Sequence, residues 1–485
     1  MGPRRRQRAV GLSAPGAKRR NGPRRNRQGK TGNRPLPDAA EKPGLAARQA
    51  AHRILGAILD AKSSMDGLTD EFHGHPHYLA LEPRDRALVR AILLTSLRNY
   101  GDLDGVIARF TDKPLPAGAT GLRNILIAGL AQILFLDIPD HSAVDLAVAA
   151  AQSDPRARRF AGLVNAILRR AAREKDSLLA GFTETPVRAP RWFAERLDAI
   201  FGPETAAAID ACHRIEAPID LTLKRKEQEK AADWAERLGA IVLPTGSLRL
   251  TGPSRDIVDL DGFGAGSWWV QDAAAAMPAR LFGDLAGKRA ADLCAAPGGK
   301  TAQLADAGAH VTALDLSANR LKRLVSNLER LGLDGACRTI AADLFAFAPD
   351  APFDAVLLDA PCSSTGTVRR HPDVPFTKSP ADIEKLADLQ ARMLEKAASF
   401  VTPGGLLVFS NCSLDPLEGE EVARRFAGSH RDFEIVPVRG EEAPGFEAAI
   451  TADGFLRLTP AHLDLGDPAI SGVDGFFAAR FRRLL

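Results

Sequence analysis

The sequence predicts a multidomain protein: an all-α N-terminal domain, a small α+β connector, and a C-terminal α/β domain built on a mainly parallel sheet. Apolar residues recur at three- and four-residue spacings from about residue 45 to 170, which is typical of amphipathic helices. From about residue 266, short apolar strands alternate with helical patterns, as in a sheet with crossover helices. The length of 485 residues also favours more than one domain.

Composition restricts the class of protein. Apolar residues make up 45% of the chain and charged residues 26%, as in an ordinary globular protein. The five cysteines are too few and too scattered for a disulfide framework, and their spacings match no zinc pattern. We therefore expect a reducing cytoplasm and no metal ion. No apolar run is long enough to span a bilayer, so no membrane partner is expected.

Residues 1–40 are predicted to form a disordered basic arm. Residues 1–36 contain twelve Lys and Arg and no acid, which leaves 52 of the 64 basic residues against 60 acidic residues in the rest of the chain. Such an arm is expected to bind polyanions without sequence preference. A purely solubilising tail and an organellar presequence remain alternatives. A secretory signal is not expected, because no apolar segment follows the arginines.

Residues 41–175 are predicted to be the helical domain. Apolar stripes run through 45–59, 84–98, 122–136, 141–152 and 160–170, and Pro139 separates two of these helices. His73, His75 and His77 lack a supporting Cys or acid pattern, so a solvated loop is a better prediction than a metal site.

Residues 176–265 are predicted to be the connector. A helix opens at Pro190 and breaks at Gly202-Pro203. Strands over 218–223, 240–243 and 247–251, with a helix over 227–238, complete the α+β unit. Lys224, Arg225 and Lys226 are predicted to be a solvated charge run, with RNA phosphate contact as the alternative.

Residues 266–485 are predicted to be the domain that binds a ligand. An apolar strand runs into a glycine-rich turn at 294–300, and a helix follows it. Gly298 and Gly299 allow backbone amides to approach a ligand closely. The glycine spacing matches neither a phosphate loop nor a dinucleotide fingerprint, which disfavours a dehydrogenase. Three later strands end in Asp315, Asp343 and Asp359, where a doubly wound sheet binds its ligand.

These motifs, with Asp-Ala-Pro-Cys at 359–362, resemble those of S-adenosylmethionine-dependent RNA cytosine-5 methyltransferases. The resemblance implies a Rossmann-like class I methyltransferase domain with S-adenosylmethionine as its cofactor. The cofactor-binding residues that it implies are Cys294, Ala295, Ala296, Pro297, Gly298, Gly299, Lys300, Asp315, Asp343 and Asp359.

The chemistry of such enzymes explains why two strand ends carry thiols. Carbon 5 of cytosine becomes nucleophilic only after a thiolate adds to carbon 6, and a base must later remove the carbon 5 proton. The segment 410–413 resembles the motif of the nucleophile, which assigns that role to Cys412, although Asn411 replaces the usual Thr. The segment 359–366 resembles the motif whose cysteine, here Cys362, assists proton removal and product release. Asp359 is expected to contact N3 of the base. The alternative for both thiols is a buried small apolar side chain.

The N-terminal domain also resembles a known fold. Asp85-Arg86 with 96–98, Ile138-Pro139 and the segment 162–169 are similar to the NusB-type RNA-binding fold. The order of a NusB-like domain, a connector and a methyltransferase domain resembles the bacterial RsmB/Sun type, which methylates 16S ribosomal RNA. The resemblance implies an rRNA-processing enzyme with RNA as its partner, no DNA, and a monomeric state. The same chemistry on tRNA, and a noncatalytic RNA-binding or ribosome-assembly factor, remain alternatives.

Three further segments carry predictions. Trp268 and Trp269 are expected to pack in the core rather than stack on bases. The segment 369–373 resembles one that lies near the substrate in the family, so a phosphate contact is expected there. The segment 415–421 is predicted to open a helix, with its acidic side chains at the helix N-terminus.

Overall fold

In the computed structural model, the residues described are 42–116, 118–188, 190–252 and 256–485. Residues 43–485 form one compact unit. The basic arm predicted over residues 1–40 lies outside the described residues. None of the described helices is long and apolar enough to cross a membrane.

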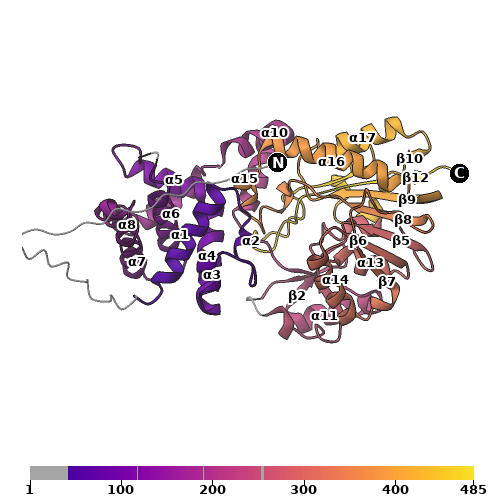
Figure 1. Ribbon diagram of the computed structural model, residues 1–485, viewed down its shortest axis with the longest axis horizontal. Helices are drawn as coiled ribbons and strands as arrows, with labels where there is room; N and C mark the ends of the chain where they lie inside the picture. The colour runs from indigo at the N-terminus through magenta and orange to yellow at the C-terminus, as the bar shows by residue number, and fades with distance from the viewer. Residues whose placement is uncertain (1–41, 117, 189, 253–255) are drawn as a thin grey trace, which may run out of the picture. The chain divides into compact units, whose positions relative to one another are not determined.

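The N-terminal domain is all-helical, as predicted, and is built around one central helix (Figure 1). Helix α6 (Thr120–Phe135) is buried along almost its whole length because α1, α4, α5, α7, α8 and α9 all pack against it. Pro139 lies between α6 and α7, as expected. The helices are α1 (Leu45–Leu59), α2 (Met65–Leu68), α3 (Pro76–Leu79), α4 (Pro83–Arg98), α5 (Tyr100–Arg109), α6, α7 (Asp140–Ser153), α8 (Ala161–Arg173) and α9 (Lys175–Glu184).

The connector combines helices with a four-stranded antiparallel sheet in the order β2-β3-β1-β4. Helix α10 (Arg191–His213) kinks at Gly202, whose φ of 75° suits glycine. Trp268 is fully buried and Trp269 is 5% exposed, so the prediction that both pack in the core is confirmed. The other elements are β1 (Asp220–Leu223), α11 (Ala231–Leu238), β2 (Ala240–Val242), β3 (Leu248–Leu250) and β4 (Trp268–Val270).

The prediction of a solvated charge run at 224–226 was wrong for Lys224. This residue is 8% exposed, and its ammonium donates to the carbonyl oxygen of Leu331 at the end of helix α14 (Ala318–Leu331) of the C-terminal domain. The backbone N–H of Arg225 donates to Asp306 in the same domain. This segment therefore joins the connector to the C-terminal domain.

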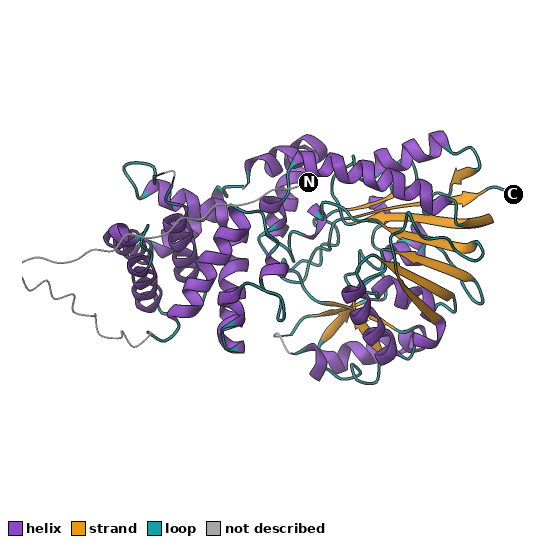
Figure 2. Ribbon diagram, viewed as in Figure 1, coloured by secondary structure: helices purple, strands orange, loops and turns teal. Residues whose placement is uncertain are grey.

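The C-terminal domain contains the predicted mainly parallel sheet, with helices on both faces (Figure 2). Its strands lie in the order β10-β12-β9-β8-β5-β6-β7, with β11 paired to β12. Strands β5 to β9 are parallel to their neighbours, whereas β12 runs antiparallel to β9. The strands are β5 (Arg289–Leu293), β6 (His310–Asp315), β7 (Cys337–Ala341), β8 (Phe353–Asp359), β9 (Val401–Asn411), β10 (Phe433–Ile435), β11 (Leu456–Leu458) and β12 (Phe476–Arg483).

Side-chain alternation along the strands builds a core on each face of this sheet. In β8, Val356 and Leu358 pack in the cluster that contains α16 and α17, whereas Leu357 packs in the cluster that contains α12 and α13. Such strands, buried on both faces, are typical of parallel sheets. The helices are α12 (Met277–Arg280), α13 (Gly299–Asp306), α14, α15 (Val374–Thr377), α16 (Pro380–Ala398) and α17 (Glu420–Ser429).

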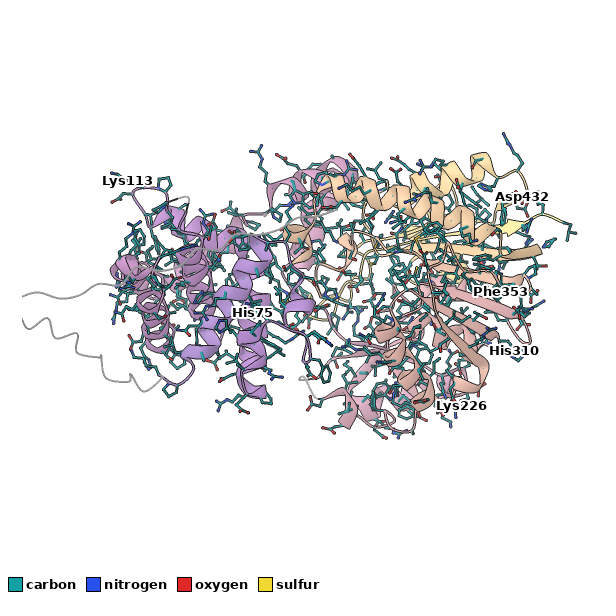
Figure 3. All side chains as sticks on the ribbon, in the orientation of Figure 1. His75, Lys113, Lys226, His310, Phe353 and Asp432 are labelled. Atoms are coloured by element: carbon teal, nitrogen blue, oxygen red, sulfur yellow. The ribbon has the colours of Figure 1, made fainter. Side chains whose placement is uncertain are left out.

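The strand order changes direction between β5 and β8, since β6 follows β5 on one side and β9 follows β8 on the other. Figure 3 shows His310 and Phe353, the first residues of β6 and β8, at one edge of the sheet. The carboxyl ends of these strands, with Asp315 and Asp359, lie at the opposite edge. That edge, at the switch point, is where an open α/β sheet binds its ligand.

Candidate active site

The turn after β5 has a backbone that only particular residues can adopt. Cys294 has a φ of 67° and Gly298 a φ of 105°, both in the left-handed region. A Cβ on Gly298 would lie 2.8 Å from Cγ of Leu324, so no side chain fits there. Because α13 begins at Gly299, the turn and the first N–H groups of this helix face the same edge of the sheet.

A cavity of about 380 Å³ lies against this turn. Residues 294–300 form one side of it, and the segment Trp269–Asp272 forms another. Acidic side chains outnumber basic ones in its lining. The acids are Asp220, Asp272, Asp292, Asp359 and Asp474, and the bases are Lys300, Arg330 and Arg370.

Two buried carboxyl oxygens of this lining have no hydrogen-bond partner among the described residues, namely Oδ1 of Asp292 and Oδ1 of Asp474. Burial raises the pKa of Asp292 to about 7. Burial, and then the charge of Asp272, raise the pKa of Asp474 to about 7. Unpaired acceptors in an acidic cavity suit a ligand that carries positive charge. These carboxyl groups therefore fit S-adenosylmethionine, whose sulfonium and ammonium groups are both cationic.

The two other predicted acids lie outside the lining of this cavity. Asp315 is buried beside the turn, where it accepts from the N–H groups of Ala296 at 3.1 Å and Ser317 at 2.9 Å. Arg320 contacts it at 3.2 Å. Asp343 is exposed beyond β7 and accepts from the N–H of Phe345. The structure thus brings Asp315 to the turn and leaves Asp343 apart from it.

The two predicted catalytic thiols lie side by side. Strands β8 and β9 are parallel neighbours, with Asp359 opposite Ser410, so the loops after them start at the same edge of the sheet. The Sγ atoms of Cys362 and Cys412 are 3.4 Å apart. This distance fits a hydrogen bond between a thiol and a thiolate.

The two thiols are not equivalent. The hydrogen bond from Cys362 lowers the pKa of Cys412 against the opposing effect of burial, and Lys300 lowers it further. The same hydrogen bond, with burial, raises the pKa of Cys362 well above its ordinary value. The two shifts have opposite directions, and they favour ionisation of Cys412 over that of Cys362.

Lys300 and Asp359 connect the glycine turn to the two loops that follow β8 and β9 and carry Cys362 and Cys412, here called the thiol loops. The ammonium of Lys300 lies 2.8 Å from Oδ2 of Asp359, and Oδ1 of Asp359 accepts from the hydroxyl of Ser410 at 2.9 Å. The carboxylate of Asp359 therefore joins the glycine turn to the ends of β8 and β9.

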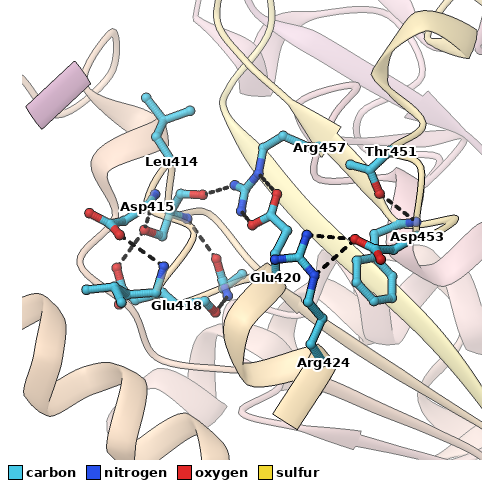
Figure 4. Close-up of polar contacts among 12 residues, drawn as sticks. Leu414, Asp415, Glu418, Glu420, Arg424, Thr451, Asp453 and Arg457 are labelled. Atoms are coloured by element: carbon cyan, nitrogen blue, oxygen red, sulfur yellow. Dashed lines mark hydrogen bonds and ion pairs between the residues drawn. The ribbon is translucent and has the colours of Figure 1, made fainter. Parts of the chain in front are cut away.

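The prediction that the acids of 415–421 lie at a helix N-terminus is confirmed for Glu420 and Glu421, which stand in the first turn of α17, and was wrong for Asp415 and Glu418, which precede the helix. No side chain caps this helix. Asp415 pairs with Arg196 at 2.7 Å, and Glu420 pairs with Arg457 (Figure 4). Glu418 is fully buried between the two thiol loops. Nothing in the local pattern distinguishes these acids from capping residues, because their partners lie far away in the sequence.

A phosphate contact was predicted for the segment 369–373, but its two arginines, Arg369 and Arg370, make contacts within the protein. Arg369 is 1% exposed. Arg370 donates to Asp272 at 2.7 Å and to Asp474 at 2.9 Å, so its charge is neutralised internally. Asp373 accepts from the N–H of Met65 in the helical domain. The segment links three parts of the chain, and the charge of Arg370 is used in contacts within the protein.

His73, His75 and His77 are not arranged as a metal centre. His77 contacts Arg53, and the side chain of His75 accepts from the N–H of His77. Within the described residues there is no group of three or more His, Cys, Asp or Glu side chains that is arranged to hold a metal ion.

Comparisons with known proteins agree with this architecture. The family model described as 16S rRNA methyltransferase RsmB/F matches residues 285–482, and that of the NusB family matches residues 45–173. Ribosomal RNA small subunit methyltransferase B of Pseudomonas putida is 34% identical over 457 residues, covering 90% of this chain and 98% of the relative. The protein of the same name from Xanthomonas campestris is 36% identical over 409 residues, covering 81% and 90%. A solved methyltransferase homologue from Pyrococcus horikoshii has a TM-score of 0.51 at 28% identity, covering 64% of this chain and 99% of that one.

Proposed function

The chain belongs to the 16S rRNA methyltransferase RsmB/F family, and we propose that it methylates carbon 5 of a cytosine in 16S ribosomal RNA through a covalent bond to Cys412. The observation that carries this proposal is the pair of inequivalent thiols, 3.4 Å apart, at the carboxyl ends of adjacent strands beside the glycine turn. One thiol with a lowered pKa and one with a raised pKa match a reaction that needs one nucleophile and one group that transfers a proton.

S-adenosylmethionine is the methyl donor. When bound, it supplies a methyl group carried on a cationic sulfur. Carbon 5 of the activated base would accept this methyl group. The turn at 294–300 would hold it through backbone amides, and Asp315 would hold its ribose hydroxyls. Asp359 faces the same cavity, and Asp343 stays a predicted contact at the end of β7.

Cys412 acts first. Its lowered pKa raises the fraction present as the thiolate, which is the nucleophilic form, and this sulfur adds to carbon 6 of the cytosine. Asp359, which is held by Lys300 and Ser410, stabilises the proton at N3 as electron density moves into the ring.

Cys362 acts last. Its thiol stays protonated largely because it donates to the sulfur of Cys412. That cause disappears once the Cys412 sulfur is bonded to carbon 6, so Cys362 can then release its proton to solvent, and the thiolate that remains takes the carbon 5 proton. Loss of this proton lets the Cys412 thiolate leave and frees the methylated RNA.

The choice of substrate rests on two findings. The relatives with 34% and 36% identity are named as methyltransferases of small-subunit ribosomal RNA. The N-terminal domain matches the NusB family, which supports binding to RNA ahead of the catalytic domain. The presence of Cys412 together with the glycine turn favours an enzyme over a noncatalytic assembly factor.

A transfer assay with mapping tests the proposal. The purified protein is incubated with methyl-labelled S-adenosylmethionine and either a 16S rRNA transcript or a tRNA pool. The methylated base is then mapped by bisulfite sequencing. We expect one 5-methylcytosine in 16S rRNA and none with the Cys412→Ala protein. Labelling of tRNA alone would contradict the assigned substrate, and label at a position other than carbon 5 would contradict the chemistry.

A further inference from the structure

Glu418 occupies an unusual place for a carboxylate. Its side chain is fully buried in the segment between β9 and α17, and no Lys, Arg or His of the described residues forms an ion pair with it. A buried charge without a counterion is costly unless hydrogen bonds replace the lost water. Here four donors do so.

These donors come from the two thiol loops and from α16. Oε1 accepts from the N–H of Ser363 at 2.8 Å and from Nε2 of Gln390 at 3.0 Å. Oε2 accepts from the hydroxyl of Ser363 and from that of Ser413 at 2.6 Å. Ser363 directly follows Cys362, and Ser413 directly follows Cys412, so one carboxylate contacts the neighbour of each thiol.

The backbone of Glu418 adds a further contact to the Cys412 loop. Its carbonyl oxygen accepts from Nδ2 of Asn411 at 2.7 Å, and Oδ1 of Asn411 accepts from the N–H of Ser413 at 3.0 Å. Cys412 is therefore flanked on both sides by residues bonded to Glu418. Figure 4 shows Glu418 beside the Leu414 and Asp415 end of this loop.

The chemistry of the donors explains why this position needs a carboxylate. All four partners donate, and an ionised carboxylate is a side chain that accepts several hydrogen bonds without donating any. Burial raises the pKa of Glu418, while the bonds from Ser363 and Ser413 oppose that rise and favour the charged form. An amide at this position accepts on one side only, so either the two serine hydroxyls or the N–H of Ser363 and Nε2 of Gln390 lose their acceptor.

We propose that Glu418 is a positioning residue, whose carboxylate fixes the loops of Cys362 and Cys412 against each other and so sets the separation of the two sulfur atoms. This inference rests on the proposed function, because it concerns the two thiols that the reaction uses. The charge has a second effect, since Glu418 is one of the groups that raise the pKa of Cys362. It thereby helps to keep Cys362 protonated while Cys412 ionises.

The test measures the thiol separation without RNA or cofactor. Phenylarsine oxide forms two arsenic–sulfur bonds with a pair of nearby thiols and releases one water, so its retention after a monothiol wash reports that the pair is in place. Wild-type protein is expected to retain the arsenical, and Cys362→Ala to lose it. In Glu418→Gln the affinity should fall about tenfold or more, the effect of losing a hydrogen bond to a charged group. The value of kcat for methyl transfer should fall about a hundredfold, as expected for reacting groups displaced by an ångström, with KM for RNA unchanged.

The matched control is Glu442→Gln. Glu442 pairs with the buried Arg480 at 2.7 Å in the same domain and contacts neither thiol loop, so this variant removes a partly buried carboxylate elsewhere. It should retain the arsenical as wild type does. The double variant Ser363→Ala/Ser413→Ala removes both hydroxyl donors, and it replaces Glu418→Gln if that protein does not fold.

The outcomes separate the two proposals. Arsenical affinity in Glu418→Gln or the double-serine variant equal to that of wild type would overturn the positioning role, whatever the methylation activity. A loss of affinity in Glu442→Gln as large as that in Glu418→Gln would overturn it too, because the effect would then be general destabilisation. If wild-type protein methylates no cytosine, the proposed function fails, while the arsenical result still decides the role of Glu418.

Discussion

The ammonium of Lys300 lies 2.8 Å from Oδ2 of Asp359, which joins the first turn of α13 to the end of β8. Both side chains line the cavity beside the glycine turn, and both act on the pKa of Cys412, with Lys300 lowering it and Asp359 raising it. One ion pair therefore connects the proposed cofactor site with the proposed nucleophile. This connection allows the first prediction.

Lys300→Met should move the pH dependence of methylation to higher pH. Loss of the ammonium removes a charge that stabilises the Cys412 thiolate, so the pKa of Cys412 rises. Each unit of this rise lowers the thiolate fraction below that pKa about tenfold. The measurement is kcat/KM from about pH 6 to about pH 9, where the rising limb reports the free enzyme. Lys300→Arg keeps the charge and should move the limb less, and identical profiles for all three proteins would contradict the prediction.

Asp315→Ala should weaken the binding of S-adenosylmethionine. Asp315 is buried and accepts from the backbone of Ala296 inside the turn, so its loss removes a carboxylate from the site and loosens the turn itself. Calorimetry should show affinity lower by about tenfold to a hundredfold, the range for hydrogen bonds to a charged group. Asp388→Ala, at an exposed position of α16, is the control. Unchanged affinity in Asp315→Ala would remove this residue from the site.

The connector should depend on one buried ion pair. The side chains of Asp220 on β1 and Arg249 on β3 are both fully buried and form two hydrogen bonds of 2.7 Å. Arg249→Met leaves Asp220 without its cation, which typically costs about 3–5 kcal/mol. The double variant Asp220→Asn/Arg249→Met should be more stable than the single one, because no charge is then left unpaired. Urea unfolding followed by tryptophan fluorescence measures both, and a single variant no less stable than the double one would contradict the argument.

Local patterns in the sequence were sufficient for the main elements of the fold. Apolar periodicity placed the helices of the N-terminal domain, and strand–helix alternation predicted the parallel sheet. The juxtaposition of Cys362 and Cys412 also followed, because thiols after parallel strands must meet at one edge if those strands are neighbours. The domain boundaries at about 175 and 265 stay predictions.

Contacts between distant segments could not be predicted in this way. Arg370 was expected near RNA phosphate, yet its partners Asp272 and Asp474 lie 98 and 104 residues away. Glu418 looked like a residue at a helix start, and only the folded chain brings Ser363 to it. Charged residues have the same local appearance whether they meet water or a buried partner, since the partner is chosen by the tertiary fold.

Asp292→Asn should change how stability depends on pH. Burial raises the pKa of Asp292 from 3.8 to about 7, so between these pH values the folded protein retains a proton that the unfolded chain has released. The folded state then binds more protons than the unfolded state, and the contribution of this group to stability is lost as pH rises through that window. Asn stays neutral and can still accept from Thr301, which donates to Asp292 at 2.6 Å.

The variant should therefore gain stability relative to wild type on going from about pH 5 to about pH 8, with the greatest gain above the raised pKa. Thermal unfolding at both pH values measures it. Asp350→Asn is a control, because Asp350 is exposed and its pKa is lowered, chiefly by a hydrogen bond to its own backbone N–H. An equal difference between Asp292→Asn and wild type at the two pH values would show that Asp292 titrates as it does in the unfolded chain.

The last prediction separates the two thiols. Cys412→Ala removes the proposed nucleophile, so neither a covalent RNA adduct nor methylated RNA should form. Cys362→Ala leaves the Cys412 sulfur in place but removes the thiol 3.4 Å from it. Addition to carbon 6 should be slower, because the hydrogen bond that lowers the pKa of Cys412 is gone. The methylated adduct, once formed, should persist, since no group takes the carbon 5 proton and the thiolate cannot leave.

A denaturing gel with labelled RNA distinguishes these states. Cys362→Ala should give a slow-migrating protein–RNA band that accumulates with time and contains the transferred methyl group. The double variant should give none, which shows that the band requires Cys412. Raising the pH should speed its formation in Cys362→Ala, because the remaining thiol then ionises more fully. A band in Cys412→Ala and none in Cys362→Ala would reverse the two roles, and the direction of the two pKa shifts argues against that result.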